Sequence, residues 1–306
     1  MTKSDSSFVV RVDDRVTVGP EAMMPVSDRG FLYGDSVFET LVAFGPRILD
    51  FDEHIERLHQ SAAELYMDVP WPSQQLKFEI EELLGMVKCP KSAVRLIVTR
   101  GDGVGLAAGG ACNMRRVIIC RPADPIPPRF LSEGIGLKRK ALPYTIRGAA
   151  AKTSSYGRSI AALSEVQKAG FDDVLWSNSE GEITEASTAN IFFVGREGDA
   201  GEIVTPPANS GLLLGITRNR VMEIIKKTGA EFREAVVYAD EIPRFDEAFL
   251  CSTVRGLIPV SRIDNHRLHS ARATSLFKAL EGAFLRTTWE RSGVTKVDWG
   301  SGGPVH

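Results

Sequence analysis

A lysine and a glutamate, each in an unusual stretch of sequence, are the residues best suited to chemistry. Lys152 follows three alanines and precedes Thr153-Ser-Ser-Tyr156, with no acidic residue near it in sequence. Glu185 opens the run Glu185-Ala-Ser-Thr-Ala-Asn190-Ile-Phe-Phe, which turns apolar as a strand entering a core would. A lysine amine forms a Schiff base with an aldehyde, and a carboxylate aimed at a ring nitrogen keeps that nitrogen protonated. Together they indicate the chemistry of pyridoxal phosphate.

Both residues also have an ordinary interpretation, because most lysines and most glutamates at strand edges are solvated surface charges. The residues around them favour a role in chemistry. The small residues before Lys152 would let a flat ring approach the backbone closely. Burial there would lower the lysine pKa from its reference value of about 10.4 and make a neutral, nucleophilic amine accessible. A carboxylate such as Glu185, at the entrance to an apolar run, needs a partner.

A phosphate group needs its own site, and the run Leu212-Leu-Leu-Gly215-Ile-Thr217-Arg offers one. A glycine turn that leads into a helix presents backbone N–H groups and the positive end of the helix dipole, and Thr217 adds a hydroxyl. The same pattern is also an ordinary helix cap. Arg57 is expected off the apolar face of its helix, where it could bind a phosphate or pair with a neighbouring glutamate. Thr253 supplies a hydroxyl where a strand ends, or simply occupies a turn.

The composition is that of a globular enzyme. The chain has 306 residues, of which 43% are hydrophobic and 25% charged, so two domains are expected. A formal net charge of -2 and a pI near 6.3 give no reason to expect nucleic acid or an anionic membrane as a partner. The four cysteines form no CxxC pair, the amino terminus has no apolar signal segment and no apolar run is long enough to span a membrane. We therefore expect a soluble cytoplasmic protein with small-molecule partners and no metal.

Hydrophobic periodicity predicts a mixture of strands and helices. The amino-terminal part is predicted to contain a hairpin over residues 9–18, a strand over 37–44, a helix capped by Asp52, a helix from Ser73, and strands over 94–99 and 117–120. Four prolines then fall within residues 121–128, which disfavours a regular helix or a central strand. The domain boundary is placed here. The predicted parts are a small α/β domain over 1–121, a linker over 122–130, a large domain over 131–290 and a flexible tail over 291–306.

Strands dominate the prediction for the second part of the chain. A helix follows Lys152 and ends near Gly170, since glycine is favoured at helix C-termini. A last helix is expected over residues 270–286. The other predicted elements are strands over 134–139, 173–176, 182–185, 191–194 paired with 203–205, 232–237, 247–251 and 257–263, and a helix over 217–228.

These segments together resemble the class IV, or fold type IV, pyridoxal-phosphate enzymes. That family includes branched-chain aminotransferases, D-amino-acid aminotransferases, (R)-selective amine transaminases and aminodeoxychorismate lyase. The resemblance spans nearly the whole chain and rests on seven segments in order. They are Ser27-Asp-Arg-Gly-Phe-Leu-Tyr33-Gly-Asp-Ser-Val-Phe38-Glu-Thr, Asp52-Glu-His-Ile-Glu-Arg57-Leu, Thr99-Arg-Gly, Lys152-Thr-Ser-Ser-Tyr156, residues 185–192, Leu214-Gly-Ile-Thr217 and residues 252–260.

The resemblance implies a mixed α/β (α+β) fold with a smaller amino-terminal domain and a larger carboxy-terminal pseudo-barrel. It also implies a homodimer in which the site is completed across the subunits. By position, Lys152 resembles the Schiff-base lysine and proton shuttle, Glu185 the partner of the pyridine nitrogen, and Tyr156 the hydrogen-bond donor to the ring oxygen. The residues that resemble the phosphate-binding group are Arg57, Ile216, Thr217 and Thr253.

The substrate pocket is implied less closely. Tyr33, Phe38 and Arg100 fall where the family places pocket residues, and Arg100 could hold a carboxylate through two hydrogen bonds. The alternative roles for these three residues are core packing and a surface charge. D-amino-acid aminotransferases carry a histidine two residues after the corresponding arginine, where this chain has Asp102, and the Tyr-X-Arg-Pro pattern of branched-chain enzymes is also absent.

The function expected from these residues is transamination. An amino group would move between a branched-chain L-amino acid, a D-amino acid or an (R)-amine and a 2-oxo acid, through an aldimine on Lys152. The alternative within the family is 4-amino-4-deoxychorismate lyase, which uses the same cofactor-binding residues. A more remote alternative is a dimer that binds pyridoxal phosphate without catalysis.

Overall fold

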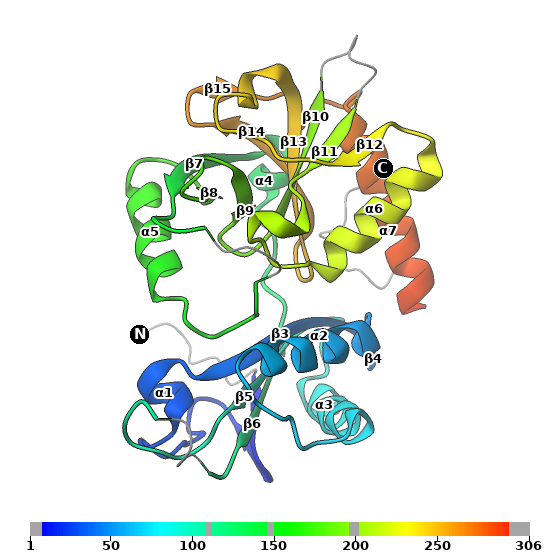
Figure 1. Cartoon of the computed structure of the whole chain (residues 1–306). Helices are drawn as coiled ribbons and strands as arrows, with labels where there is room; N and C mark the ends of the chain where they lie inside the picture. The colour runs from blue at the N-terminus through cyan, green and yellow to red at the C-terminus, as the bar shows by residue number, and fades with distance from the viewer. Residues whose placement is uncertain (1–7, 108–111, 146–149, 196–201, 294–306) are drawn as a thin grey trace. The chain divides into compact units, whose positions relative to one another are not determined.

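The chain folds into two compact units, which a computed structural model describes over residues 8–107, 112–145, 150–195 and 202–293 (Figure 1). Unit 1 comprises Met1–Pro125, Ala151–Tyr156 and Trp289–His306, and unit 2 comprises Ile126–Ala150 and Gly157–Thr288. The domain limits expected from the sequence stay predictions. Residues 294–306 of the expected tail lie outside the described residues.

Unit 1 is built on a six-stranded antiparallel sheet in the order β2-β1-β6-β5-β3-β4. The predicted hairpin over residues 9–18 is confirmed by the pairing of β1 with β2. The long central strands are those predicted near residues 37, 94 and 117. The strands are β1 (Val9–Val12), β2 (Arg15–Val18), β3 (Ser36–Phe44), β4 (Arg47–Ile48), β5 (Lys91–Thr99) and β6 (Arg115–Pro122).

Two helices, α2 (Phe51–Glu64) and α3 (Ser73–Val87), pack on one face of this sheet (Figure 1). Alternation along the strands turns residues such as Val37, Leu41 and Leu96 toward the helices, where they form one apolar core. The predicted N-cap of α2 was wrong by two residues. Asp50 holds the cap position with a φ of 53°, and Asp52 lies in the first turn, where its charge suits the positive end of the helix dipole. A short helix, α1 (Arg29–Tyr33), precedes β3.

Unit 2 contains a strongly curled sheet in the order β12-β11-β10-β13-β14-β7-β8-β9, with β15 paired to β14. Both faces of its central strands are buried, so they are almost continuously apolar. The predicted pairing of 191–194 with 203–205 is confirmed. The strands are β7 (Ile135–Ala141), β8 (Asp173–Ser177), β9 (Ile183–Ala186), β10 (Asn190–Gly195), β11 (Ile203–Thr205), β12 (Phe232–Glu234), β13 (Phe245–Ser252), β14 (Gly256–Ile263) and β15 (His266–Arg267).

Helices cover unit 2 on its outer side. α6 (Ile216–Thr228) and α7 (Leu276–Ser292) lie side by side and share a core with Phe192 and Phe249, whose rings are stacked 5.1 Å apart (Figure 1). α5 (Gly157–Lys168) packs on β8, and the short α4 (Pro128–Ser132) precedes β7. The mixed α/β fold with a small antiparallel unit and a larger curled sheet confirms the predicted fold class.

The last helix begins six residues later than the sequence predicted, at Leu276 instead of residue 270. Ser270 is fully buried, and its hydroxyl accepts a hydrogen bond of 2.9 Å from the Ala248 N–H, which ties this segment to β13. The Glu247 carboxylate then accepts the N–H groups of Leu276 and Phe277 at 3.0 and 2.9 Å. A distant side chain therefore caps α7, and local periodicity could not have shown it.

Candidate active site

Lys152 lies in unit 1, on the edge of β3 that β5 leaves open. The Phe38 N–H donates to the Lys152 carbonyl at 3.0 Å, and Val37 forms an isolated bridge with Thr153. The Lys152 N–H donates to the Ser61 hydroxyl of α2 at 3.1 Å. Backbone bonds to a strand and a helix therefore fix the Lys152 backbone, although it belongs to no regular element.

The amine of Lys152 lies beside an aromatic ring. Its Nζ is 4.4 Å from the centroid of the Phe38 ring, and the Tyr156 ring meets Phe38 edge-on at 5.6 Å. The guanidinium of Arg95 stacks on the same ring at 3.8 Å. Burial lowers the pKa of Arg95, an effect that the nearby Tyr156 opposes. Three predicted site residues, Lys152, Tyr156 and Phe38, are thus brought together, and Arg95 joins them.

Arg57 is buried in unit 1 instead of lying at the surface. Its Nε and Nη2 donate to the two oxygens of Glu39 at 2.7 Å each, and His54 Nδ1 lies 2.7 Å from Glu39 Oε2. Burial alone would raise the pKa of Glu39, but the hydrogen bonds from Arg57 and His54 outweigh it and lower the pKa to about 2. The neighbouring glutamates of α2 that the sequence offered as ion-pair partners are not the ones Arg57 uses in this pair.

Tyr33 and Arg100, the other residues predicted for the substrate pocket, have structural contacts. The Tyr33 hydroxyl accepts the Gly105 N–H at 2.8 Å. Arg100 donates through Nε to Asp35 at 2.8 Å and through its other nitrogens to the carbonyls of Leu65 and Tyr66, at the C-terminal end of α2. Because this arrangement uses all three guanidinium nitrogens, Arg100 holds the loop in place here.

Glu185 lies half-buried on β9 of unit 2. The Asn190 side-chain amide and the Leu213 N–H both donate to its Oε2, at 3.1 and 3.2 Å. Asn190 also donates to the Leu213 carbonyl at 2.9 Å, which joins the two partners. Both donors are neutral, so the carboxylate is oriented without being neutralised by a cation in these bonds. Its Oε1 takes no part in them.

The turn before α6 lies next to Glu185. A Cβ on Gly215 would fall 2.0 Å from Asn190 Oδ1, so any larger residue there would have to displace the Asn190 amide that bonds to Glu185. Gly215 is the N-cap of α6 and brings no capping side chain, and the first-turn N–H groups of any helix lack intrahelical partners. Ile216 and Thr217 are buried in that first turn. An anion is the natural partner of such a helix start.

Thr253 lies in the turn that joins β13 to β14, as the sequence predicted for it. Asn190 pairs with Cys251 on β13, so this turn follows directly from the strand beside the Glu185 partner. Arg255, in the same turn, donates to the Thr188 hydroxyl at 3.0 Å. Unit 2 therefore brings Glu185, the start of α6 and the Thr253 turn into one neighbourhood.

The sequence analysis did not predict three side chains that contact the predicted site residues. They are Glu39, His54 and Arg95. Strand alternation contained a signal for the first and the last, since odd residues of β3 face α2 and Arg95 lies directly opposite Thr40, on the other face. A glutamate on a helix-facing position requires a cation from that helix. His54 is one helical turn from Arg57, which was the remaining signal.

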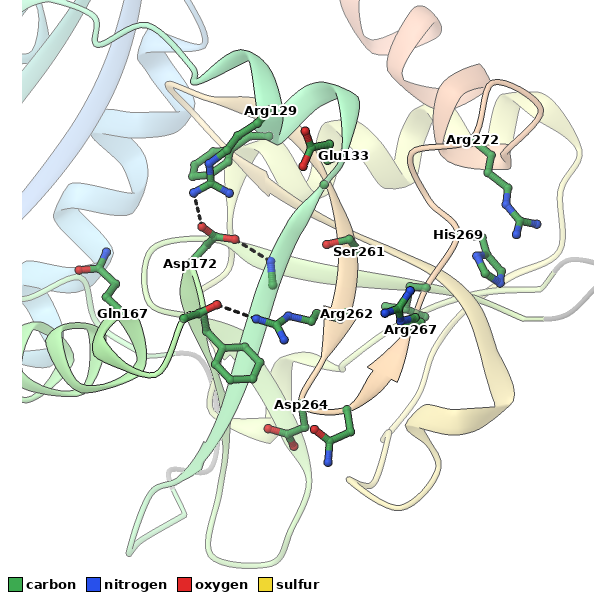
Figure 2. Close-up of a pocket in the computed structure, with 17 residues that line it drawn as sticks. Arg129, Glu133, Gln167, Asp172, Ser261, Arg262, Asp264, Arg267, His269 and Arg272 are labelled. Carbon is green, nitrogen blue, oxygen red and sulfur yellow. Dashed lines mark hydrogen bonds and ion pairs between the residues drawn. The ribbon is translucent and has the colours of Figure 1, made fainter.

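A groove of about 1220 Å³ on unit 2 lies between α4, β14 and the segment after β15 (Figure 2). None of the predicted site residues is among the described residues that line it. Arg129 pairs with Asp172 at 2.5 Å, and Arg262 donates to the Gly170 carbonyl at 2.6 Å (Figure 2). Arg267 and Arg272 are exposed. The groove is polar.

Two kinds of feature are absent from residues 8–107, 112–145, 150–195 and 202–293. No group of histidine, cysteine and acidic residues there is arranged to hold a metal ion. No helix in those ranges is long and apolar enough to cross a membrane.

Known proteins match this chain over most of its length. The profile of the family described as amino-transferase class IV matches residues 36–263. A protein described as a branched-chain-amino-acid aminotransferase of Methanocaldococcus jannaschii is 31% identical over 275 residues, 88% of this chain and 93% of the relative. The D-alanine aminotransferase of Bacillus licheniformis is 27% identical over 284 residues, 91% of this chain and 98% of the relative. The crystal structure of a branched-chain aminotransferase from Thermoproteus uzoniensis with norvaline has a TM-score of 0.81 at 25% identity, covering 92% of this chain and 95% of that one.

The chain therefore belongs to the class IV aminotransferase family, as the motifs predicted, and it is an enzyme of that class. Enzymes of this class work with pyridoxal phosphate, which confirms the predicted cofactor. The residues present fit that group. Lys152 offers an amine beside an aromatic ring, Glu185 an oriented carboxylate, and Gly215 a helix start where a side chain would clash.

Proposed function

We propose that this enzyme is a transaminase that moves an amino group between an amino acid and a 2-oxo acid, with Lys152 as its catalytic residue. The observation that carries the proposal is the setting of Lys152. Its backbone is fixed to β3 and α2, and its amine lies against Phe38 together with Tyr156. A fixed amine in a half-buried, partly aromatic setting suits both covalent attachment of an aldehyde and proton transfer.

The residues proposed to hold pyridoxal phosphate are those that resemble the cofactor-binding residues of the family. When bound, the cofactor supplies an aldehyde and an electron-accepting ring. Lys152 anchors it, Tyr156 donates a hydrogen bond to its ring oxygen, and Glu185 keeps the ring nitrogen protonated. Neutral donors on Glu185 Oε2 support this role, because they leave the carboxylate its negative charge. The residues proposed for the phosphate are Arg57, Ile216, Thr217 and Thr253.

In the reaction, Lys152 Nζ takes the proton from the α-carbon of the amino substrate and later returns it. The backbone of Lys152 is fixed and its Nζ lies over Phe38, so the same amine is proposed to act first as base and then as acid. Phe38 excludes water from one side of the amine, since it is itself only 2% exposed.

The proposed substrates are branched-chain L-amino acids or D-amino acids. Relatives of both kinds support this range. We assign recognition of the substrate carboxylate to Arg95 instead of Arg100, because Arg95 lies beside Phe38 while Arg100 is engaged by Asp35 and by α2. An arginine fork and a carboxylate match in geometry and charge. Phe38 remains a pocket residue in this proposal.

We also propose a homodimer, supported by an exposed apolar patch on unit 1. Phe31, Val104 and Leu106 are 72%, 87% and 82% exposed, and Arg29 joins their segments by donating to the carbonyls of Gly105 and Leu106. Patches of this kind mark protein interfaces. Tyr33 belongs to the same segment, so its predicted substrate role would be exercised across the dimer.

The dimer is tested by light scattering on two single variants. Phe31→Glu is expected to shift the protein toward the monomer, because a buried charge in an interface is costly. Phe78→Glu, on the 68% exposed Phe78 of α3, is the matched control and should leave the mass unchanged. A dimer that persists in Phe31→Glu places the interface elsewhere.

The proposed reaction is tested with a panel of amino donors and two acceptors. D-amino acids, branched-chain L-amino acids and (R)-aromatic amines are each offered with 2-oxoglutarate or pyruvate, alongside aminodeoxychorismate. Transfer of the amino group from at least one amino acid is the expected result. Activity confined to cleavage of aminodeoxychorismate would assign the lyase instead. A cofactor-loaded protein whose absorbance responds to no donor would make it a binding protein.

A further inference from the structure

Three polar side chains of unit 1 form a cluster on the helix-covered side of the six-stranded sheet. Glu39 on β3 and His54 on α2 are fully buried, and Arg57, one turn after His54, is 9% exposed. Such groups are costly to bury unless each is paired. The cluster lies beside Lys152, because Phe38, the neighbour of Glu39, bonds to the Lys152 carbonyl, and Ser61 of α2 bonds to the Lys152 N–H.

The geometry of the cluster fixes one edge of the Arg57 guanidinium. Nε and Nη2 donate to the two Glu39 oxygens, both at 2.7 Å, which is a side-on bidentate pair. The Nη1 amino group takes no part in that pair. An arginine held this way keeps its guanidinium plane in one orientation.

His54 in turn fixes Glu39. With the pKa of Glu39 at about 2, the carboxylate is charged and only accepts hydrogen bonds, so His54 Nδ1 carries the proton in their 2.7 Å contact. His54 Nε2 is buried and has no hydrogen-bond partner among the described residues. Glu39 Oε2 therefore accepts from both Arg57 and His54, and the carboxylate has little freedom to rotate.

We propose that Glu39 and His54 are positioning residues that set the orientation of Arg57 for the phosphate of the cofactor. This inference rests on the proposed function, in which Arg57 binds that phosphate. A guanidinium whose rotamers are already restricted loses less conformational entropy when a phosphate binds. Glu39 and His54 touch neither cofactor nor substrate in this proposal and act through Arg57.

The same unit offers a matched control, the buried pair of Glu79 on α3 with Arg116 on β6. Arg116 Nε and Nη2 donate to the two Glu79 oxygens at 2.7 and 2.8 Å, and both residues are 5% exposed. β5 separates β6 from β3, so this pair lies about two strand spacings, roughly 10 Å, from Glu39. It has the same bidentate geometry as the Glu39–Arg57 pair but joins α3 to β6 instead of α2 to β3.

The test compares Glu39→Gln with Glu79→Gln in the full-length protein. Both variants remove one charge from a buried pair, so both should lower the unfolding temperature. The apo forms are titrated with pyridoxal phosphate, and the bound phosphate is observed by phosphorus NMR. Glu39→Gln is expected to weaken cofactor binding roughly tenfold and to shift the phosphorus signal, since a charge-assisted pair orients the guanidinium. Glu79→Gln should bind within about twofold of wild type with an unchanged signal.

Equal cofactor affinity in the two variants would overturn the inference. If Glu39→Gln does not fold, His54→Gln decides the matter. Weaker cofactor binding and a shifted phosphorus signal in that variant support the inference, and wild-type values for both overturn it. Failure of the proposed function is a different result, because the wild-type protein itself would then not bind pyridoxal phosphate.

Discussion

Arginines on the two faces of the six-stranded sheet have different partners. On the face covered by α2 and α3, Arg57 and Arg116 each form a bidentate pair with a buried glutamate. On the opposite face, Arg95 stacks on Phe38 at 3.8 Å, and no carboxylate in the described parts of the chain pairs with it. On the first face, carboxylates of the protein itself pair with both arginines. The second carries a half-buried cation beside Lys152, which is the arrangement an anionic substrate would complete.

The arginines of unit 1 differ in the groups that they contact. Arg57 and Arg116 neutralise carboxylates inside a core, and Arg100 binds Asp35 together with the end of α2. Arg95 has an aromatic ring as its neighbour instead. A cation on an aromatic face is held in place but keeps its charge, so it stays able to bind an anion. Residue type and sequence position alone do not distinguish these cases.

The largest expected effect concerns Lys152, on the open edge of β3. Lys152→Ala should lower turnover by about a thousandfold or more, because it removes both the anchoring amine and the base. Steady-state rates with the best amino donor measure this. Lys91→Ala is the control, since Lys91 also lies over a phenylalanine of β3, Phe44, at 5.9 Å. It should retain turnover near wild type, and a Lys152→Ala variant as active as Lys91→Ala would refute the assignment.

We expect acid to have an intermediate effect on the free energy of unfolding, through Glu39 on the face covered by α2 and α3. The pKa of Glu39 is lowered from 4.5 to about 2, so its pairing stabilises the fold fully above about pH 4.5 and is lost as the pH falls through about 2. A shift of that size corresponds to about 3 kcal/mol. Urea unfolding between pH 6 and pH 2 measures it.

Glu39→Gln is the comparison for this titration. The variant should be less stable than wild type at pH 6, and its free energy of unfolding should fall less steeply below pH 4.5, because it lacks the titrating group. Parallel curves for wild type and variant would show that Glu39 is not the group whose protonation weakens the fold.

The smallest effect distinguishes Arg95 from Arg100. Arg95→Gln should raise KM for 2-oxoglutarate roughly tenfold with little change in stability, since it removes one charged hydrogen-bonding partner of the substrate. Arg100→Gln should instead destabilise the protein by about 1–2 kcal/mol and leave KM close to wild type, since its bonds are to Asp35 and to α2. The opposite pattern, with KM raised by Arg100→Gln alone, would return substrate recognition to Arg100.

Much of the chemistry could be predicted from the sequence because it is local. Lys152 with Tyr156, the turn at Gly215 and the strand after Glu185 are continuous segments, so the roles proposed for them follow from residue types that are close together in the sequence. The class of enzyme and the mixed α/β fold followed from them. The hairpin at residues 9–18 and the pairing of β10 with β11 also depend on local alternation and turns.

The features that the sequence did not predict depend on contacts between residues that are distant in sequence. Arg100 is engaged by carbonyls at the end of α2, and α7 starts where Glu247 caps it, and neither partner is near in sequence. The burial of Arg57 follows from Glu39, which is on a different element. Strand alternation could have placed Arg95 opposite Thr40, but not the Phe38 ring beneath its guanidinium.

We propose that the chemistry of this enzyme takes place at the Lys152 amine. Reduction of the cofactor-loaded protein with borohydride, followed by mass spectrometry of its peptides, tests it most directly. We expect a phosphopyridoxyl group on the peptide that contains Lys152 and none in Lys152→Ala. A label on another lysine of the wild-type protein, with the Lys152 peptide unmodified, would contradict it.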